Sequence, residues 1–321
     1  MDKSDYSGVM MIRKSVILHG LMWVCILTLS LSAAPLQEAG GYAGSYLRMP
    51  LSARAAALGN AVGALKESPE AFTENPALLG HLTERNFGSS FQFLSLDRSL
   101  HMIDITIPVP PTAGLAIAWV HAGVGNIQER NFANEITGEL QTSQDALFVG
   151  FANRIWESLS IGINTKIFID QLPDVTATGF GLDVGAFYAP FDFLSLGFSV
   201  KDINSKINWN TKDIYEFGSQ RTDTYPTLYQ VSGAFQFNNH VFITAAYRGS
   251  FDIFPTFHAG MEVRAGNHLA VRGGVDNRMP VLGLSTRYPV WRHIETQIDY
   301  AFLFGRYNEG ISHAFSWIFT F

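Results

Sequence analysis

Polar and apolar residues alternate along most of the chain after residue 86, in short runs separated by clusters of Gly, Asn, Asp and Pro. Because successive side chains of a β-strand point to opposite faces, this period of two predicts strands. In residues 159–169, isoleucines fall on one face and polar residues such as Ser160 and Asn164 on the other. The pattern recurs at 256–265, so one face of each strand suits an apolar environment and the other suits water.

Fourteen such runs can be placed between residues 86 and 321. Their number is even, and they have about the length that a tilted membrane strand needs. The pattern therefore predicts an all-β protein, a transmembrane antiparallel β-barrel of about 14 strands. The predicted strands lie at 87–96, 100–108, 112–123, 143–153, 159–169, 178–188, 193–200, 227–237, 240–248, 256–265, 269–275, 280–288, 294–304 and 312–321.

The connections between the predicted strands differ in length from one end of the barrel to the other. If the first strand runs outward, every periplasmic connection is tight, while residues 124–142 and 201–226 form long polar loops on the outer side and 170–177 a moderate one. Outer-membrane barrels pair short periplasmic turns with longer extracellular loops. A soluble β-sandwich would also show the alternation, so loop length is the stronger argument for a barrel.

Composition supports a membrane environment. Charged residues make up only 16% of the chain, against roughly 25% in an ordinary soluble domain, and 47% are hydrophobic. Outside the N-terminus no stretch approaches the ~20 consecutive apolar residues of a membrane helix, which argues against a helical bundle. The net charge of -6 and the lack of a basic run indicate no nucleic-acid partner, and outer-membrane lipid is the expected surrounding.

The N-terminus has the pattern of an export signal. Arg13 and Lys14 precede an apolar run at 16–31, and the small residues at 32–34 suit cleavage. We interpret residues 1–34 as a cleaved signal peptide that directs the chain to the bacterial outer membrane. The alternative is a signal anchor that stays attached.

A segment of a different kind lies between the signal and the first strand, at residues 35–85, ahead of the barrel at 86–321. Small residues dominate it, and Asn75-Pro76 marks a turn or a helix start. One interpretation is a linker or a small periplasmic cap. The other is a hatch or plug inside the barrel, where small side chains allow the backbone to approach the wall.

Two stretches of this segment resemble a known family. An alanine-rich run with Gly59-Asn60-Ala61 is followed by Glu74-Asn75-Pro76-Ala77-Leu78-Leu79, and the chain resembles the PorV/PorQ proteins at these positions and at 298–302 and 311–316. These proteins belong to the FadL-like superfamily of fourteen-stranded barrels. The resemblance implies a hatch in the lumen, with Arg54, Gly59, Asn60, Asn75 and Pro76 as its motif. Leu58-Gly59-Asn60-Ala61 departs from the Met-Gly-Gly-Ala often present in the family.

The resemblance implies two different functions. PorV-like and PorQ-like members act with type IX secretion components or bind cargo at the cell surface, while FadL-like members carry small hydrophobic compounds inward. For the first function, aromatic residues of the long outer loop are candidate partner contacts, since aromatic side chains often dominate interfaces. Packing within the loop or contact with lipopolysaccharide is the alternative role for these residues, which are Trp209, Tyr215, Phe217 and Tyr225.

No catalytic residue, cofactor or metal ligand is expected. The sequence contains no Gly-x-Ser-x-Gly and no His-Glu-x-x-His, and its only cysteine, Cys25, lies in the signal peptide. Charged residues on the predicted luminal face, such as Lys166, Glu262 and Arg272, are expected to pair with one another because buried charges stabilise only when partnered. We therefore predict a non-enzymatic barrel.

The chain ends on alternating aromatic residues. Phe315, Trp317, Phe319 and Phe321 share one face of the last predicted strand, which suits contact with lipid. A terminal aromatic also resembles the signal that the barrel-assembly machinery recognises. We expect deletion of Phe321 to reduce insertion, measured as the amount of heat-modifiable barrel in the membrane. Wild-type amounts in the deletion variant would contradict this role.

Overall fold

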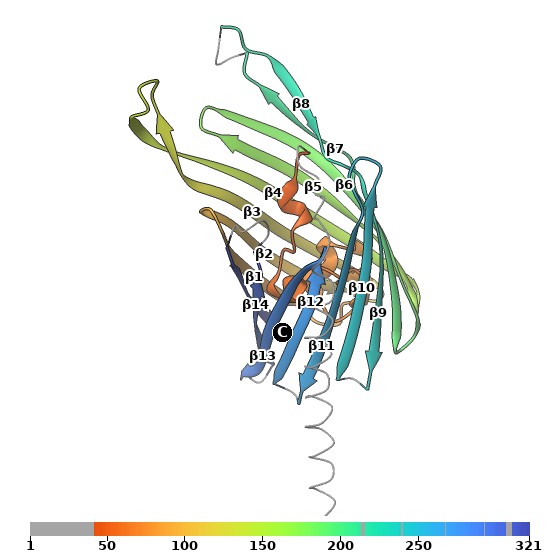
Figure 1. Cartoon of the computed structure of the whole chain (residues 1–321). Helices are drawn as coiled ribbons and strands as arrows, with labels where there is room; N and C mark the ends of the chain where they lie inside the picture. The colour runs from red at the N-terminus through yellow and green to blue at the C-terminus, as the bar shows by residue number, and fades with distance from the viewer. Residues whose placement is uncertain (1–41, 213–215, 239, 267, 292, 306–309) are drawn as a thin grey trace, which may run out of the picture.

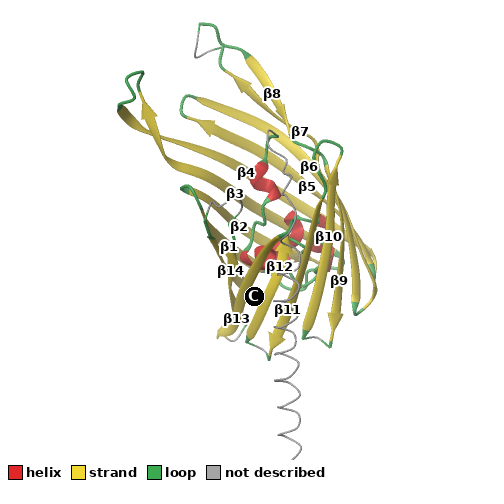
Figure 2. Ribbon diagram, viewed as in Figure 1, coloured by secondary structure: helices red, strands yellow, loops and turns green. Residues whose placement is uncertain are grey.

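A computed structural model describes residues 42–321, apart from 213–215, 239, 267, 292 and 306–309. These residues form one antiparallel sheet that closes on itself as a barrel (Figures 1 and 2). Fourteen strands make up the wall, and the short strand β8 pairs only with β7. The prediction of an all-β barrel of 14 strands is confirmed. The predicted signal peptide, residues 1–34, lies outside the described residues.

The strands fall close to their predicted positions. The first seven are β1 (Asn86–Leu94), β2 (Arg98–Val109), β3 (Ala113–Arg130), β4 (Ile136–Trp156), β5 (Leu159–Leu172), β6 (Val175–Phe191) and β7 (Leu194–Asn210). The others are β8 (Gln220–Thr224), β9 (Leu228–Phe237), β10 (Val241–Ser250), β11 (Thr256–Ala265), β12 (Leu269–Asp276), β13 (Met279–Trp291), β14 (Ile294–Leu303) and β15 (Ser312–Thr320).

Two pairings complete the cylinder. β1 pairs with β15, with Phe87 opposite Phe319, so the first and last strands meet as expected for a closed barrel. β6 pairs with β7 through a ladder whose register shifts around Leu182. Closure satisfies the backbone groups of every edge strand, which a sheet inside a bilayer requires.

The two faces of the wall differ in chemistry. On β5 the outward side chains Ile161 and Ile167 are 49% and 48% exposed, while the inward Lys166 is fully buried. Equivalent apolar side chains cover the outer face of the other wall strands. Phe315, Trp317 and Phe321 lie on this outer face, and Phe319 is half-buried in the same row. Their predicted role in assembly stays a prediction. Among the described residues, no helix is long and apolar enough to cross a membrane.

The long polar loops predicted at 124–142 and 201–226 are largely strands. β3 and β4 continue as a hairpin to a turn at residues 131–135, and β7 continues into a second hairpin with β8. Both hairpins project beyond the rest of the barrel (Figure 1). These strands could not be recognised by alternation, because both of their faces lie in water and need no apolar residues at every second position. The predicted loop at 170–177 is also wrong, since β5 and β6 join at residues 173–174.

The hairpins define one end of the barrel, here called the hairpin end. At the opposite end, the short-turn end, consecutive strands are joined by two or three residues. This asymmetry agrees with the predicted difference between periplasmic turns and outer loops.

Residues 42–85, here called the luminal segment, lie inside the barrel (Figure 2). The segment contains four short helical elements whose starts follow from the sequence. Ser52 and Asn75 each accept a hydrogen bond from the backbone two or three residues on, and Pro76 occupies the first helical position. The elements are η1 (Ser45–Arg48), α2 (Ala53–Ala57), η2 (Pro69–Thr73) and η3 (Pro76–His81).

Candidate functional site in the barrel lumen

The luminal segment lies directly on glycines of the wall. A Cβ added at Gly162 of β5 would fall 2.5 Å from the carbonyl carbon of Pro76 and 2.6 Å from the nitrogen of Ala77. At Gly185 of β6 it would fall 2.1 Å from Oδ1 of Asn75. Wall strands without side chains at these positions therefore form the surface on which η3 rests.

This contact gives a direct test of docking. Gly162→Ala is expected to weaken docking of η3 by about 1–3 kcal/mol, because the added methyl overlaps the backbone of Pro76 and Ala77. The measurement is the rate at which a protease cuts the luminal segment in the inserted barrel, which should rise. Gly125→Ala is the matched control, since a Cβ there meets no atom within 4 Å. Equal cleavage of both variants would contradict the tight contact.

Polar side chains of the wall bind the backbone of the segment. Ser160 Oγ donates to the carbonyl of Ala77 at 2.7 Å, and Asn164 Nδ2 donates to that of Phe72 at 2.9 Å. In the other direction, Asn75 Nδ2 donates to the wall carbonyl of Ala186 at 3.1 Å. Short helices leave unpaired backbone groups, and these contacts satisfy some of them inside the lumen.

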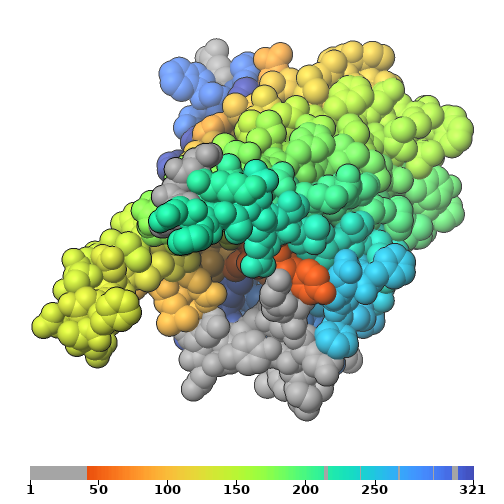
Figure 3. Space-filling view, turned by 90° about the horizontal axis from the view of Figure 1, so that it is seen from above, coloured from red at the N-terminus to blue at the C-terminus, as the bar shows by residue number. Residues whose placement is uncertain are grey.

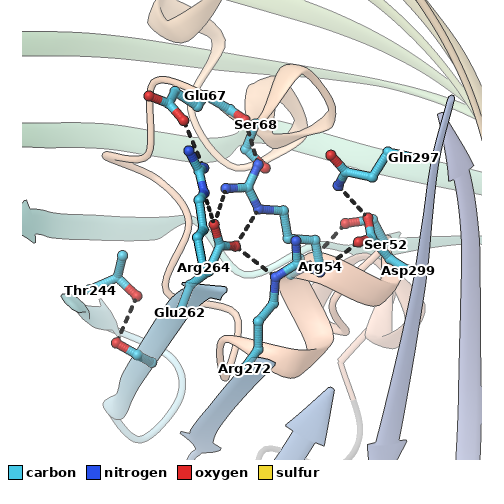
Figure 4. A network of polar contacts seen from close by, with 12 residues as sticks. Ser52, Arg54, Glu67, Ser68, Thr244, Glu262, Arg264, Arg272, Gln297 and Asp299 are labelled. Atoms are coloured by element: carbon cyan, nitrogen blue, oxygen red, sulfur yellow. Dashed lines mark hydrogen bonds and ion pairs between the residues drawn. The ribbon is translucent and has the colours of Figure 1, made fainter. Parts of the chain in front are cut away.

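A first ion-pair network joins α2 to strands β11, β12 and β14 (Figure 4). Glu262 is its centre: it accepts from Arg54 at 3.1 and 3.2 Å, from Arg272 at 2.6 Å and from Arg264 at 2.9 Å. Arg272 also pairs with Asp299 at 2.6 Å, and Arg264 with Glu67 at 2.7 Å. The network thus contains three cations and three carboxylates. The cations are Arg54, Arg264 and Arg272, and the carboxylates are Glu67, Glu262 and Asp299.

A second set of charges lies on the other side of the lumen. Glu74 of the luminal segment pairs with Lys201 of β7 at 3.0 Å and with Arg248 of β10 at 2.6 Å. Nearby, Lys166 pairs with Asp183 at 2.6 Å and with Asp202. The expected pairing of luminal charges is confirmed for Lys166, Glu262 and Arg272. The participation of Arg54 and Glu74 was not predicted, since nothing in the sequence indicates which wall charge each would meet.

Two glutamates of the luminal segment differ in their surroundings. Burial raises the pKa of Glu74, but Lys201 and Arg248 outweigh burial and hold the pKa below its ordinary value. For Glu70, burial raises the pKa and the nearby Arg54 offsets only part of the effect. Glu74 is thus held as a carboxylate that ties the segment to the wall.

A cavity of about 220 Å³ opens at the hairpin end and is here called the outer cavity. Its floor is formed by Tyr46 and Met49 of the luminal segment. Figure 3, viewed from above, shows the start of this segment as a red-orange group of atoms. The walls come from β1 to β5 and β7, and the surface is mainly apolar. Its apolar lining includes Leu94, Leu100, Ala122, Val124, Leu172 and Trp209.

A cavity of similar volume, about 230 Å³, lies at the short-turn end and has a different character. Lys66, Glu67, Glu84, Arg287 and Glu295 are among its lining residues, so it is polar and charged. Elsewhere the buried residues of α2, η2 and η3 fill the lumen. The two ends of the barrel therefore present an apolar pocket and a hydrophilic one.

The aromatic residues predicted as partner contacts fall in three different environments. Phe217 is 92% exposed near the tip of the β7–β8 hairpin, while Trp209 lines the outer cavity and donates to Asp223 at 3.0 Å. Tyr225 is buried and stacks on Phe168 with ring centroids 4.4 Å apart, so it is not available to a partner. Tyr215 lies outside the described residues.

All five residues of the predicted hatch motif are in the lumen. Arg54, Asn60, Asn75 and Pro76 are buried, and Gly59 has a positive φ of 62° where its added Cβ would fall 2.3 Å from the carbonyl oxygen of Val275. Their action as a hatch stays a prediction. Within the described parts of the chain, no group of three or more His, Cys, Asp or Glu side chains is placed to hold a metal ion.

The fold and the lumen together define a class: a fourteen-stranded transmembrane barrel with its N-terminal segment inside. Similar solved structures include the toluene transporter TodX of Pseudomonas putida, with 11% identity, a TM-score of 0.60, and coverage of 84% of this chain and 96% of TodX. The monoaromatic hydrocarbon channel CymD and a Pseudomonas aeruginosa FadL homologue each have 12% identity, a TM-score of 0.55 and the same coverage. At this identity the likeness shows the fold alone.

No family model and no curated protein matches the sequence. The FadL-like fold implied by the resemblance is confirmed by these structures. The narrower PorV/PorQ membership stays a prediction.

Proposed function

We propose that this chain is an outer-membrane channel for small hydrophobic compounds. The outer cavity carries the proposal, because it is an apolar pocket at one mouth of a barrel whose outer face requires a bilayer. Ligand pockets are typically concave and mostly apolar, with a few polar groups that orient the ligand. The fold adds support, since solved barrels of this fold are described as a toluene transporter and a monoaromatic hydrocarbon channel.

The size of the outer cavity indicates the size of the compound. An apolar cavity of about 150 Å³ holds benzene, so one of about 220 Å³ accommodates a compound of about one ring. If the longer connections face outward, as in other outer-membrane barrels, the cavity opens to the medium and is the first binding site. A compound bound there rests on η1, so onward passage requires the luminal segment to shift.

The test is uptake of a radiolabelled single-ring hydrocarbon by cells that produce the protein, compared with cells carrying an empty vector. Ala122→Trp should abolish the gain in uptake, because Ala122 lines the outer cavity and the indole would fill it. Ile117→Trp, on the outer face of the same strand, is the matched control and should retain it. No gain in the wild type, or equal uptake in both variants, would contradict the proposal.

The projecting hairpins favour a second candidate, a partner-binding role of the type IX secretion kind. Phe132 and Phe217 are almost fully exposed near the two tips, where an aromatic side chain without a partner is unusual. A channel does not need strands that extend so far beyond its wall.

The two roles can be separated by shortening the hairpin of β3 and β4. Replacing residues 127–140 by an Asn-Gly turn should preserve hydrocarbon uptake and remove any secretion component or cargo that co-purifies from the native membrane. Absence of such partners from the wild-type preparation would contradict the second role and leave the channel proposal standing.

A further inference from the structure

Asp170 is an acidic residue buried beside the outer cavity. It is 3% exposed and is among the residues that line the cavity from β5. Its Oδ2 accepts a hydrogen bond from Gln144 Nε2 at 2.8 Å, while Oδ1 has no hydrogen-bond partner among the described residues. A buried carboxylate oxygen without a donor is unusual, because such groups are costly when unsatisfied.

The cations nearest to the cavity are engaged elsewhere. Arg98 lines the cavity, but its guanidinium donates to the carbonyl and the hydroxyl of Ser95 at 2.9 and 3.2 Å. Lys166, four residues from Asp170 on the same strand, pairs with Asp183 and Asp202. Within the described part of the chain, no cation forms an ion pair with Asp170, so its charge is not neutralised by the wall.

Tyr46 at the floor of the cavity and the neighbouring Tyr225 lie in the same negative field. Burial raises the pKa of Tyr46, and Tyr225, Asp170 and Asp202 raise it further. The pKa of Tyr225 is raised first by burial and then by Asp170 and Asp202. The floor of the cavity is therefore apolar and has a negative electrostatic potential.

We propose that the outer cavity accepts neutral and cationic compounds of about one ring and rejects carboxylates, with Asp170 as the residue that determines this specificity. The inference rests on the proposed function and narrows its substrate class. A carboxylate in the cavity would meet a like charge in a poorly solvated site, where repulsion is much stronger than in water. A hydroxyl or ammonium group, in contrast, donates a hydrogen bond, and Asp170 is an acceptor.

The test is binding of four matched probes to the wild-type barrel in lipid nanodiscs at neutral pH. Fluorine NMR would give the affinity of 4-fluorotoluene, 4-fluorobenzyl alcohol, 4-fluorobenzylamine and 4-fluorobenzoate, with empty nanodiscs subtracted. We expect the benzoate to bind at least about tenfold more weakly than the alcohol, a difference of one decade in affinity. Asp170→Asn should remove most of this difference, because the amide keeps the shape and loses the charge.

Asp174→Asn is the matched control, since it removes the same charge from the exposed turn between β5 and β6 and should keep the wild-type ratio. Equal binding of benzoate and alcohol by the wild type would overturn the charge filter while leaving the channel proposal intact. So would an unchanged ratio in a folded Asp170→Asn barrel. If none of the four probes binds, both the filter and the proposed binding site are wrong.

Discussion

Replacing Glu262 by glutamine is expected to lower the free energy of unfolding by about 3–5 kcal/mol, the usual cost of removing one partner from a buried ion pair. Glu262 is 1% exposed and accepts hydrogen bonds from Arg54, Arg264 and Arg272, so the amide leaves buried guanidinium groups without their shared carboxylate. The measurement is urea unfolding of the barrel in lipid vesicles, followed by loss of the heat-modifiable form.

The control for this variant is Glu295→Gln, which removes the same charge from an exposed position on β14. Its effect should stay within about 0.5 kcal/mol, as for surface substitutions in general. A change below about 1 kcal/mol for Glu262→Gln would mean that water reaches the network and replaces the lost carboxylate.

Deleting residues 45–81 is expected to open the barrel. These residues fill the lumen between the outer cavity and the short-turn end. The wall beneath them carries apolar side chains and also polar ones, such as Ser160, Asn164 and Lys201, that water can solvate. Ion conductance through planar bilayers should rise by at least an order of magnitude, because barrel diameter grows with strand number and barrels of about 16–18 strands, only slightly wider than this one, enclose an aqueous channel.

The comparison for the deletion is the Gly162→Ala variant, in which the luminal segment is present but docked less tightly. It should give brief openings instead of a permanently open state. An inserted and heat-modifiable deletion variant that conducts no better than the wild type would show that the segment does not close the lumen.

The wall of the barrel could be predicted from the sequence because its two faces lie in different solvents. Each strand inside the bilayer needs apolar residues at every second position, and Ile161 to Ile169 show this directly. The same reasoning fails for the hairpin of β3 and β4. There the strands are surrounded by water on both sides, and Gln128 pairs with Glu139 without any apolar pattern.

The contents of the lumen could be predicted only in part. Small residues and Asn75-Pro76 indicated a segment able to lie against a wall, but the matching glycines of the wall, such as Gly162 and Gly185, look like ordinary strand residues in one sequence. Arg54 and Glu262 are separated by 208 residues along the chain. Only the closed cylinder brings them together, so no local pattern could reveal the pair. Asp170 continues the polar face of residues 159–169, but its place beside the outer cavity also depends on the position of η1.

The seam between β1 and β15 links closure of the barrel to its contents. The backbone N–H of Ala53 donates to Ser316 Oγ at 2.7 Å, and the same hydroxyl lies 2.7 Å from Ser90 Oγ across the seam. The luminal segment thus contacts β15 at the seam itself. A barrel that closes without the luminal segment lacks this contact at the seam. Assembly is therefore favoured when the segment is already inside the barrel as β1 and β15 pair.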